Sequence, residues 1–320
     1  MKRICVTGAG GFIGHHLVSR LKAEDYWVRG VDLKYPEYTD MDADEFEILD
    51  LRRSDAALQA TRGVEQVFAL AADMGGMGFI SSHHAEILHN NALINLHTLE
   101  AARLNGVSRY LYSSSACIYP EYLQTETQVT PLKESDAYPA QPQDAYGWEK
   151  LITEILCRYY GSDYGMEVRI VRFHNIYGPN GTYDGGREKA PAALCRKVAL
   201  AHDGDAIAIW GDGQQTRSFC YIDDCVEGIY RIMQSDHSEP LNLGTDEMVS
   251  IDELARLVIQ MSGKRDITLH HVDGPQGVRG RNSDNTKLAE VLGWEPRTTL
   301  EQGLLPTYRW IEKSVGLAGV

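Results

Sequence analysis

The sequence predicts an α/β protein with a doubly wound parallel sheet, joined to a smaller α/β domain at its C-terminal side. Three observations support this fold class. Short apolar runs alternate with segments of helical periodicity over the first half of the chain. A glycine-rich turn follows the first apolar run, and a run of serines follows a later one. The length of 320 residues suits one large domain or two unequal ones.

The glycine-rich turn, with the strand before it and the helix after it, is typical of a dinucleotide-binding site. Residues 8–14, Gly-Ala-Gly-Gly-Phe-Ile-Gly, lie between an apolar run and a helical segment. Backbone amides at a helix start can approach a pyrophosphate closely where glycine leaves no side chain in the way. A second strand, at 27–31, ends at Asp32, where such folds place a carboxylate on the adenosine ribose. Because this carboxylate would repel a 2′-phosphate, the sequence favours NAD over NADP.

Two further apolar runs extend the expected sheet. Residues 46–49 lead to Asp50 and Leu51, and residues 66–72 end in a pair of alanines that includes Ala71. We expect these strand ends to lie along the cofactor. Small residues such as Ala71 also occur where a helix simply packs against a sheet, and this alternative explains Ala71 nearly as well as a cofactor contact does.

The organisation of the chain changes after residue 173. Residues 1–173 are expected to form the cofactor-binding domain, with some later segments returning to it, and residues 174–320 mainly a substrate-binding domain. Residues 73–80 contain three glycines and two methionines directly after a strand end. This composition suits a flexible turn or a loop that folds over a ligand, and its place at the carboxyl edge of the sheet favours the loop.

The stretch with the clearest chemistry is 113–120, where three serines and Cys117 follow an apolar strand. Burying hydroxyl groups there costs free energy unless they form hydrogen bonds. Further on, Tyr146 and Lys150 are four residues apart on a helical segment, which puts them on one face. The Tyr-x-x-x-Lys spacing alone most often marks an exposed helix face. Together with the glycine loop and the serines, it predicts a site that handles protons.

Composition excludes several classes of function. The net charge of −14 argues against nucleic acid as a partner, and no run approaches the roughly 18 apolar residues of a membrane span. The N-terminus enters a strand at once, leaving no room for a signal peptide. The six cysteines form no Cys-x-x-Cys pair and no metal-ligand spacing. We therefore expect a reduced, cytoplasmic protein without a metal site.

The sequence resembles the extended short-chain dehydrogenase/reductase family, which includes NAD-dependent epimerases and dehydratases. This resemblance, whose narrower form extends from about residue 4 to 313, implies a Rossmann fold with NAD. It implies that Tyr146 is the acid/base, that Lys150 lowers its pKa and holds the nicotinamide ribose, and that Ser115 bonds the reacting oxygen. A free phenol with a pKa near 10 is a poor base, and a nearby cation stabilises the phenolate. The residues that carry the resemblance are Gly8, Gly11, Gly14, Asp32, Ser115, Tyr146 and Lys150.

Longer motifs resemble a narrower group within that family, the enzymes that invert C3 and C5 of GDP-mannose. The pair Ala116-Cys117 stands where 4,6-dehydratases carry Asp-Glu, which excludes that assignment. The ends of the chain are shorter than in this group, and the length differs slightly around 198–205. The motifs are the segments 74–80, 114–120, 172–178, 185–191, 215–219 and 278–285.

This narrower resemblance implies that Cys117 and Lys189 form the acid/base pair of the inversion. An ordinary thiol, with a pKa of about 8.5, can exchange a proton at a carbon next to a ketone, and a lysine can act on the opposite face. The alternatives are a small buried hydrophobic cysteine and a surface lysine. The expected substrate-binding residues are Gly75, Ser115, Ala116, Cys117, Asn175, Glu188, Lys189, Lys197, Gln215, Thr216, Arg217 and Arg281. The expected cofactor-binding residues are Gly8, Gly11, Phe12, Ile13, Gly14, Asp32, Asp50, Leu51, Ala71, Tyr146 and Lys150.

The sequence therefore predicts an NAD-dependent isomerase that epimerises a nucleotide sugar, with GDP-mannose as the expected substrate. Transient oxidation at C4, proton exchange at C3 and C5, and re-reduction would leave no net redox change, so the cofactor is expected to stay bound. A plain 4-epimerase, in which Cys117 has no role, is the alternative. A dinucleotide-sensing regulator is a further one, although such proteins usually lack the Tyr/Lys pair. We expect a homodimer with no nucleic-acid or membrane partner.

Overall fold

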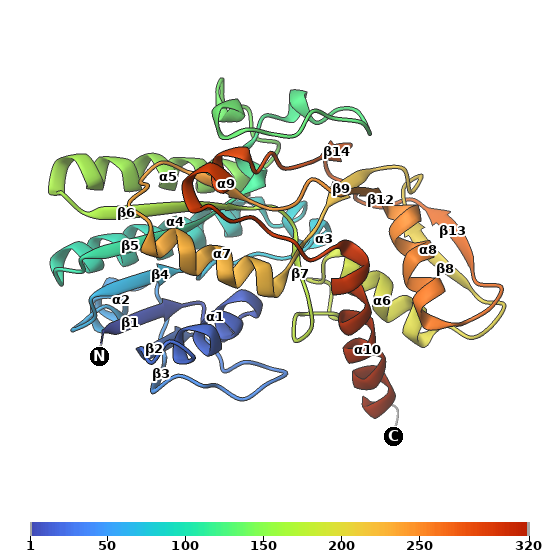
Figure 1. Cartoon of the computed structure of the whole chain (residues 1–320), viewed down its shortest axis with the longest axis horizontal. Helices are drawn as coiled ribbons and strands as arrows, with labels where there is room; N and C mark the ends of the chain where they lie inside the picture. Colours follow the sequence, from blue (N-terminus) through green and yellow to red (C-terminus); the bar gives the residue numbers. More distant parts are fainter. Residues whose placement is uncertain (1, 319–320) are drawn as a thin grey trace.

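A seven-stranded parallel sheet forms the centre of the larger part of the molecule (Figure 1). The computed structural model describes residues 2–318. The strand order is β11-β6-β5-β4-β1-β2-β3, and all neighbouring pairs are parallel, so the predicted doubly wound sheet is confirmed. The strands are β1 (Arg3–Thr7), β2 (Trp27–Asp32), β3 (Glu45–Ile48), β4 (Gln66–Ala69), β5 (Arg109–Ser115), β6 (Glu167–Phe173) and β11 (Leu241–Leu243).

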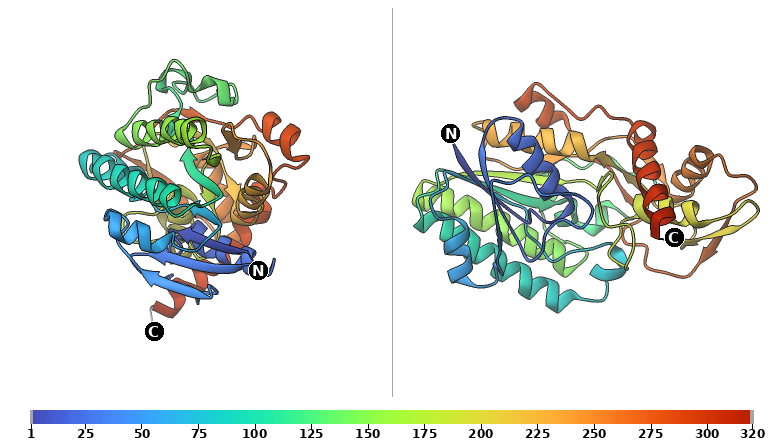
Figure 2. Two further views of the ribbon diagram at one scale, coloured as in Figure 1. Left: turned by 90° about the vertical axis from the view of Figure 1, so that its left-hand side faces the viewer. Right: turned by 90° about the horizontal axis from the view of Figure 1, so that it is seen from below.

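Helices cover both faces of this sheet, and each face has its own apolar core. On one face Leu17 of α1 and Ile229 of α7 are fully buried against the strands. On the other face Leu99 of α4 and Cys157 of α5 are fully buried. Figure 2 shows α4 and α5 side by side. The helices are α1 (Phe12–Lys22) and α7 (Ile222–Gln234) on the first face, and α2 (Ser54–Ala60), α4 (His84–Leu104) and α5 (Ala145–Tyr164) on the second.

The order of the strands reverses next to β1. The chain runs outward from β1 through β2 to β3 and then returns to build β4, β5 and β6 on the other side. At such a reversal the connections after β1 and β4 lead away in opposite directions, and a crevice forms outside the carboxyl ends of the strands. The glycine loop after β1 therefore lies where an α/β sheet of this kind binds its ligand.

The second part of the molecule lies beyond the carboxyl edge of the sheet (Figure 1). Helices α6, α8 and α10 pack together over the parallel pair β8 and β13, around a core that includes Leu194, Leu254 and Leu304. The elements are β7 (Ile176–Tyr177), α6 (Ala190–Leu200), β8 (Ala206–Trp210), β9 (Thr216–Ser218), β10 (Cys220–Tyr221), β12 (Met248–Ser250), α8 (Ile251–Ser262), β13 (Thr268–Val272), β14 (Gly280–Arg281) and α10 (Leu300–Ala318). Of the other late segments, β11 joins the large sheet, and α7 and α9 (Thr286–Leu292) pack against it.

Four short helical segments complete the described chain. They follow strand ends or lie in the long connection between β5 and α5. None of the helices within residues 2–318 has the combined length and apolar character that crossing a bilayer requires. The short segments are α3 (Met77–Ile80) and the 3₁₀ turns η1 (Ala116–Ile118), η2 (Glu121–Leu123) and η3 (Glu134–Ala137).

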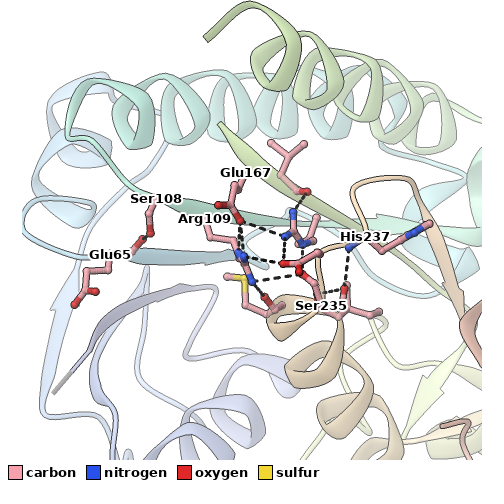
Figure 3. A network of polar contacts seen from close by, with 11 residues as sticks. Glu65, Ser108, Arg109, Glu167, Ser235 and His237 are labelled. Carbon is pink, nitrogen blue, oxygen red and sulfur yellow. Dashed lines mark hydrogen bonds and ion pairs between the residues drawn. The ribbon is translucent and has the colours of Figure 1, made fainter. Parts of the chain in front are cut away.

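At the amino-terminal edge of the sheet, arginines from β5 and β6 hold the end of α7 (Figure 3). Arg109 Nη1 donates to the Met233 carbonyl at 2.8 Å, and Arg169 Nε donates to the Ser235 carbonyl at 2.7 Å. Glu167 pairs with both arginines. Cations at a helix C-terminus are favourable because they face the negative end of the helix dipole. This network fixes α7 against β6 at the edge opposite to the glycine loop.

Candidate active site

The glycine loop after β1 forms a cradle that only glycine permits. Gly8 has a φ of +72°, and a Cβ there would lie 2.8 Å from the backbone nitrogen of Ala71. A Cβ on Gly14 would lie 2.0 Å from the Gly8 carbonyl oxygen. The loop therefore closes on itself and on the end of β4, and it leads directly into α1. These residues fit a dinucleotide, because the backbone amides at the start of α1 are open to a pyrophosphate.

Asp32 lies beside this cradle at the end of β2. Its Oδ2 accepts a hydrogen bond from the Gly10 amide at 2.9 Å, and its Oδ1 accepts one from the Leu33 amide at 2.6 Å. Burial raises the pKa of the Asp32 carboxyl, and the backbone hydrogen bonds act in the opposite direction. The carboxylate is thus fixed next to the glycine loop, where it could reach the adenosine ribose.

The other predicted cofactor residues differ in their surroundings. Phe12 and Ile13 begin α1 behind Gly11, and the Phe12 ring packs against Gly181 in the turn after β7. Asp50 is engaged with Arg52, whose guanidinium holds the pKa of this carboxyl below its usual range. Leu51 is buried in the core. Any cofactor contact of these residues remains a prediction.

A glycine inside the Tyr-x-x-x-Lys motif brings α5 against the turn η1. The Asp144 side chain caps α5 by accepting from the Gly147 amide at 2.8 Å. A Cβ on Gly147 would lie 2.2 Å from the Cys117 carbonyl oxygen, so a larger residue would push the helix away. Ser115 Oγ in turn accepts from the Cys117 amide at 3.2 Å. This close approach places Tyr146 beside Ser115 and Cys117.

Tyr146 and Lys150 are both buried at this point. Burial, and then the nearby Cys117, raise the pKa of the Tyr146 phenol well above its usual value, while a hydrogen bond with Ser115 opposes this. Burial lowers the pKa of Lys150, whose Nζ donates to the Ser113 carbonyl at 2.9 Å and lies 5.6 Å from the centre of the Tyr146 ring. The structure brings the predicted pair together. The expected lowering of the Tyr146 pKa by Lys150 stays a prediction.

Three cationic side chains gather around Cys117. Arg281 Nη1 lies 3.4 Å from the Cys117 sulfur. Arg217 on β9 is the register partner of Arg281 on β14, and its pKa is lowered by burial and by Arg281. Burial also lowers the pKa of Lys189, the residue before α6, while Cys117 raises it. Among residues 2–318, no carboxylate forms an ion pair with any of the three.

A second group of predicted substrate residues faces β8. Lys197 Nζ donates to the Ala208 carbonyl at 2.6 Å, and Gln215 Nε2 donates to the Trp210 carbonyl at 3.0 Å. Within the described chain, the buried Gln215 Oε1 has no hydrogen-bond partner. A buried acceptor of this kind requires a donor. Trp210, an exposed aromatic beside these residues, was given no role by the sequence, which predicts only a strand there.

The remaining predicted substrate residues make local hydrogen bonds or line the turns. Asn175 Nδ2 donates to the Ser218 carbonyl, and Thr216 Oγ1 donates to the Thr127 carbonyl. Glu188 accepts from the Gly186 amide. Gly75 packs against Phe79, and Ala116 is buried in η1. None of these contacts decides whether the residue binds substrate.

The glycine-rich segment 73–80 is ordered as a turn and the short helix α3, and Arg187 holds it. The Gly76 amide donates to the Arg187 carbonyl at 3.0 Å. The Arg187 guanidinium pairs with Asp73 at 2.9 Å and lies 3.8 Å from the centre of the Phe79 ring. Arg187 belongs to a motif that the resemblance uses, but sequence reasoning gave it no role. It connects the end of β4 to the segment that carries Lys189.

A cavity and the arrangement of metal-ligating side chains elsewhere in residues 2–318 can be compared with this site. A cavity of about 790 Å³ lies between α5 and the start of β6, near Arg158 and Glu167, at the amino-terminal edge of the sheet. Within residues 2–318, no group of three or more His, Cys, Asp or Glu side chains is arranged to hold a metal ion. The predicted acid/base residues Tyr146, Cys117 and Lys189 instead lie close to one another at the carboxyl edge.

Comparison with known proteins agrees with this geometry. Residues 4–244 match the NAD dependent epimerase/dehydratase family. GDP-mannose 3,5-epimerase 1 of Oryza sativa subsp. japonica is 56% identical over 315 residues, covering 98% of this chain and 82% of the relative. GDP-mannose 3,5-epimerase of Arabidopsis thaliana is 55% identical over 315 residues, covering 98% of this chain and 83% of the relative.

Solved structures share the fold over nearly the whole length. UDP-glucose 4-epimerase of Thermotoga maritima, solved with UDP-glucose, has a TM-score of 0.87 and 27% identity, covering 98% of this chain and 99% of the other. UDP-glucuronic acid 4-epimerase of Bacillus cereus, in complex with UDP-glucuronic acid and NAD, has a TM-score of 0.81 and 25% identity, with coverage of 98% and 99%. The chain belongs to the NAD-dependent epimerase/dehydratase family.

Proposed function

We propose that this protein is an NAD-dependent 3,5-epimerase of GDP-mannose, which forms GDP-L-galactose, GDP-L-gulose or both. The observation that carries the proposal is the cluster of Cys117, Lys189 and Tyr146 beside a dinucleotide cradle. A plain 4-epimerase needs only the tyrosine and its lysine, so the thiol would be idle there. The identity of 55–56% to GDP-mannose 3,5-epimerases supports the choice of substrate.

The proposed reaction divides the chemistry between two sets of side chains. NAD, when bound at the glycine loop, supplies the hydride acceptor and donor for C4. Tyr146 takes the proton of the C4 hydroxyl and later returns it, while Ser115 orients the same oxygen. The C4 ketone acidifies the hydrogens on C3 and C5. Cys117 and Lys189 then remove and deliver protons on opposite faces of the sugar.

The charges around the site suit a nucleoside diphosphate sugar. Arg217, Arg281 and Lys189 have no carboxylate partner in the described chain, and a cation in such surroundings is costly unless an anion balances it. A diphosphate supplies that charge and the acceptors that guanidinium groups prefer. Gln215 Oε1 would accept from a substrate donor, since no protein group within residues 2–318 satisfies it.

We propose the same division for the two parts of the chain. Residues 1–173 carry the glycine loop, Asp32 and the Tyr/Lys pair, and they would hold the cofactor. Residues 174–320 contribute Lys189 and Arg217, and they would mainly hold the sugar nucleotide. The site would then be completed where these two parts meet.

An exposed apolar stripe on α5 supports the proposal of a homodimer. Trp148, Ile152 and Tyr159 are 41%, 58% and 61% exposed, and their spacing of four and seven residues puts them on one side of the helix. Leu88 and Leu96 are exposed on the neighbouring helix α4. Several exposed apolar side chains on two neighbouring helices are typical of a protein interface, and two-fold symmetry would pair this surface with its own copy.

We also propose that the protein works in the cytoplasm. All six cysteines are free, and the thiol of Cys117 is partly exposed. Free thiols persist in reducing compartments, whereas an oxidising one would convert such a group to a disulfide or an oxidised form.

Incubation with GDP-mannose in deuterium oxide tests the proposed reaction, with NMR and mass spectrometry as readouts. Deuterium at C3 or C5 of the recovered sugar is expected, together with product of inverted configuration there. The matched control is Tyr146→Phe, which should give neither reduced cofactor nor deuterium uptake. Inversion at C4 without any incorporation at C3 or C5 would favour the plain 4-epimerase instead.

A further inference from the structure

Arg281, which the proposed function places at the diphosphate, also contacts the sulfur of Cys117 directly. Arg281 is 8% exposed, on the two-residue strand β14, and its Nη1 lies 3.4 Å from Cys117 Sγ. A guanidinium keeps its charge in proteins and only donates hydrogen bonds. The sulfur is therefore the acceptor, and it accepts best when it carries negative charge.

Gln124 holds Arg281 in this orientation. Arg281 Nε donates to Gln124 Oε1 at 2.6 Å. The Gln124 side chain is 1% exposed, and its Nε2 donates to the carbonyls of Tyr119 and Pro120 at 3.2 and 3.1 Å. Since the amide nitrogen is occupied by two acceptors, the amide oxygen must face the guanidinium. Gln124 thus fixes the Nε of Arg281, while its Nη1 contacts the Cys117 sulfur.

The backbone is built around the same contact. The amides of Arg279 and Gly280 donate to the Gln124 carbonyl at 2.8 and 3.2 Å. A Cβ on Gly280 would lie 2.3 Å from the Glu126 carbonyl oxygen, so β14 could not approach this loop with another residue there. Gln124 and Arg281 are 157 residues apart in sequence, yet they are joined through both side chain and backbone.

We propose that Arg281 is a positioning residue that fixes the sulfur of Cys117 and stabilises its negative charge when the proton is absent. The inference rests on the proposed function and deepens it. As Cys117 takes a proton from the carbon beside the ketone, the electron pair of the C–H bond moves into the enolate. The proton from Lys189 then forms the new C–H bond on the other face. The Cys117 sulfur thus gains the proton while it stays in contact with the Arg281 guanidinium.

The surroundings of Cys117 leave Arg281 as the group best placed for this role. The titratable groups near the thiol are Tyr146 and Lys150 on α5, Lys189 before α6, and Arg217 on β9. Lys150 is bonded to the Ser113 carbonyl, and Arg217 donates to the carbonyls of Thr216 and Val278. Within the described residues, Arg281 alone of these groups donates a side-chain hydrogen bond to the sulfur.

The reactivity of the thiol tests the proposal without nucleotide sugar. Iodoacetamide is uncharged and reacts with the thiolate, and the other five cysteines are buried, so modification of Cys117 can be followed by peptide mass mapping. At neutral pH, Arg281→Met should slow the modification about tenfold or more. The difference should shrink in alkaline buffer, where a thiol without the guanidinium also ionises. Arg279→Met is the control, because this neighbouring arginine pairs with Asp212 instead and should leave the rate unchanged.

Two milder variants separate the effect of charge from loss of fold. Gln124→Met removes only the anchor and should slow the modification less than Arg281→Met does. Arg281→Lys keeps the charge and should recover part of the rate. If Arg281 merely fills space, its removal would expose the sulfur and speed the reaction. Modification of a folded variant as fast as the wild type would overturn the proposal, whereas a wild type that exchanges no deuterium would overturn the proposed function alone.

Discussion

At the scale of single residues, the candidate site combines two kinds of environment. Tyr146 and Lys150 are enclosed, and burial favours the neutral form of each. Cys117 is partly exposed, its sulfur contacts Arg281, and it lies close to Lys189. The two environments suit two tasks, because hydride transfer at C4 needs a dry site and proton exchange at C3 or C5 needs polar partners.

Removing the Cys117 thiol should therefore separate these two tasks. Cys117→Ala leaves Ser115, Tyr146 and Lys150 in place, so transient reduction of NAD should persist. Deuterium exchange at C3 and C5 should fall by about 10²–10⁴-fold, the usual contribution of a positioned acid/base group. Absorbance of the reduced cofactor and mass spectrometry of the sugar measure the two effects. Cys157→Ala, at a buried core position, is the control. Full deuterium exchange at C3 and C5 by a folded Cys117→Ala variant would contradict the 3,5-epimerase mechanism.

A buried histidine makes the fold sensitive to acid. His174 is fully buried beside Asn242, and burial lowers its pKa to about 3. In the unfolded chain a histidine titrates near 6.5, so between these two values the unfolded state binds more protons than the native state. Stability should then decrease as the pH falls from about 6.5 towards 3, by at most about 1.4 kcal/mol per pH unit from this group.

Denaturant unfolding at several pH values measures this dependence. His174→Asn removes the titrating ring, so the free energy of unfolding of this variant should change less between pH 7 and pH 5 than that of the wild type. His84→Asn is the matched control, because the His84 side chain is exposed. An unchanged slope in His174→Asn would show that other groups dominate the acid response.

At the scale of elements, short turns bring the chemical groups together. Gly147 lets α5 approach η1, and Arg187 holds the turn after β4 against the segment before α6. The second connection spans the two parts of the chain, since Asp73 follows the fourth strand and Arg187 lies near Lys189. The position of Lys189 thus depends on a contact with the other part of the site.

Loosening this contact should affect proton exchange more than oxidation. Arg187→Met removes the ion pair with Asp73, so residues 73–80 and the segment carrying Lys189 should become more mobile. We expect faster backbone hydrogen exchange in both segments and a reduced rate of deuterium incorporation at C3 and C5. Arg53→Met, which removes an exposed pair with Asp55 elsewhere, is the control. Unaltered hydrogen exchange in 73–80 would contradict the connecting role of Arg187.

The features that could be predicted from the sequence are those that depend on spacing within one short segment. The glycine loop, Asp32 and the Tyr146/Lys150 pair each lie within one strand, turn or helix, where local geometry decides the outcome. The contact between Gln124 and Arg281 could not be predicted in this way, because it depends on the register of β14 against β9 and on the packing of a long loop. Strand β11, with three residues, is likewise too short to carry a pattern.

At the scale of the whole molecule, helix α5 has two sides with different surroundings. One side of α5 buries Tyr146 and Lys150 beneath the site, and the other exposes Trp148, Ile152 and Tyr159. Helix α4 lies beside it, as Figure 2 shows, so the two helices form one broad surface. A second copy on this surface would support the helix that holds Tyr146, which links the proposed assembly to the stability of the candidate site.

Charging this surface should separate the subunits. In the double variant Ile152→Glu/Tyr159→Glu, like charges from both copies would meet across the two-fold axis, and burying them unpaired would be costly. Light scattering after gel filtration should give the mass of one chain for this variant and twice that mass for the wild type. Leu200→Glu, at an equally exposed apolar position on α6, should remain a dimer. Because α5 would lose its support, the monomeric variant should also unfold at a lower temperature, and a wild type that elutes as a monomer would contradict the proposed dimer.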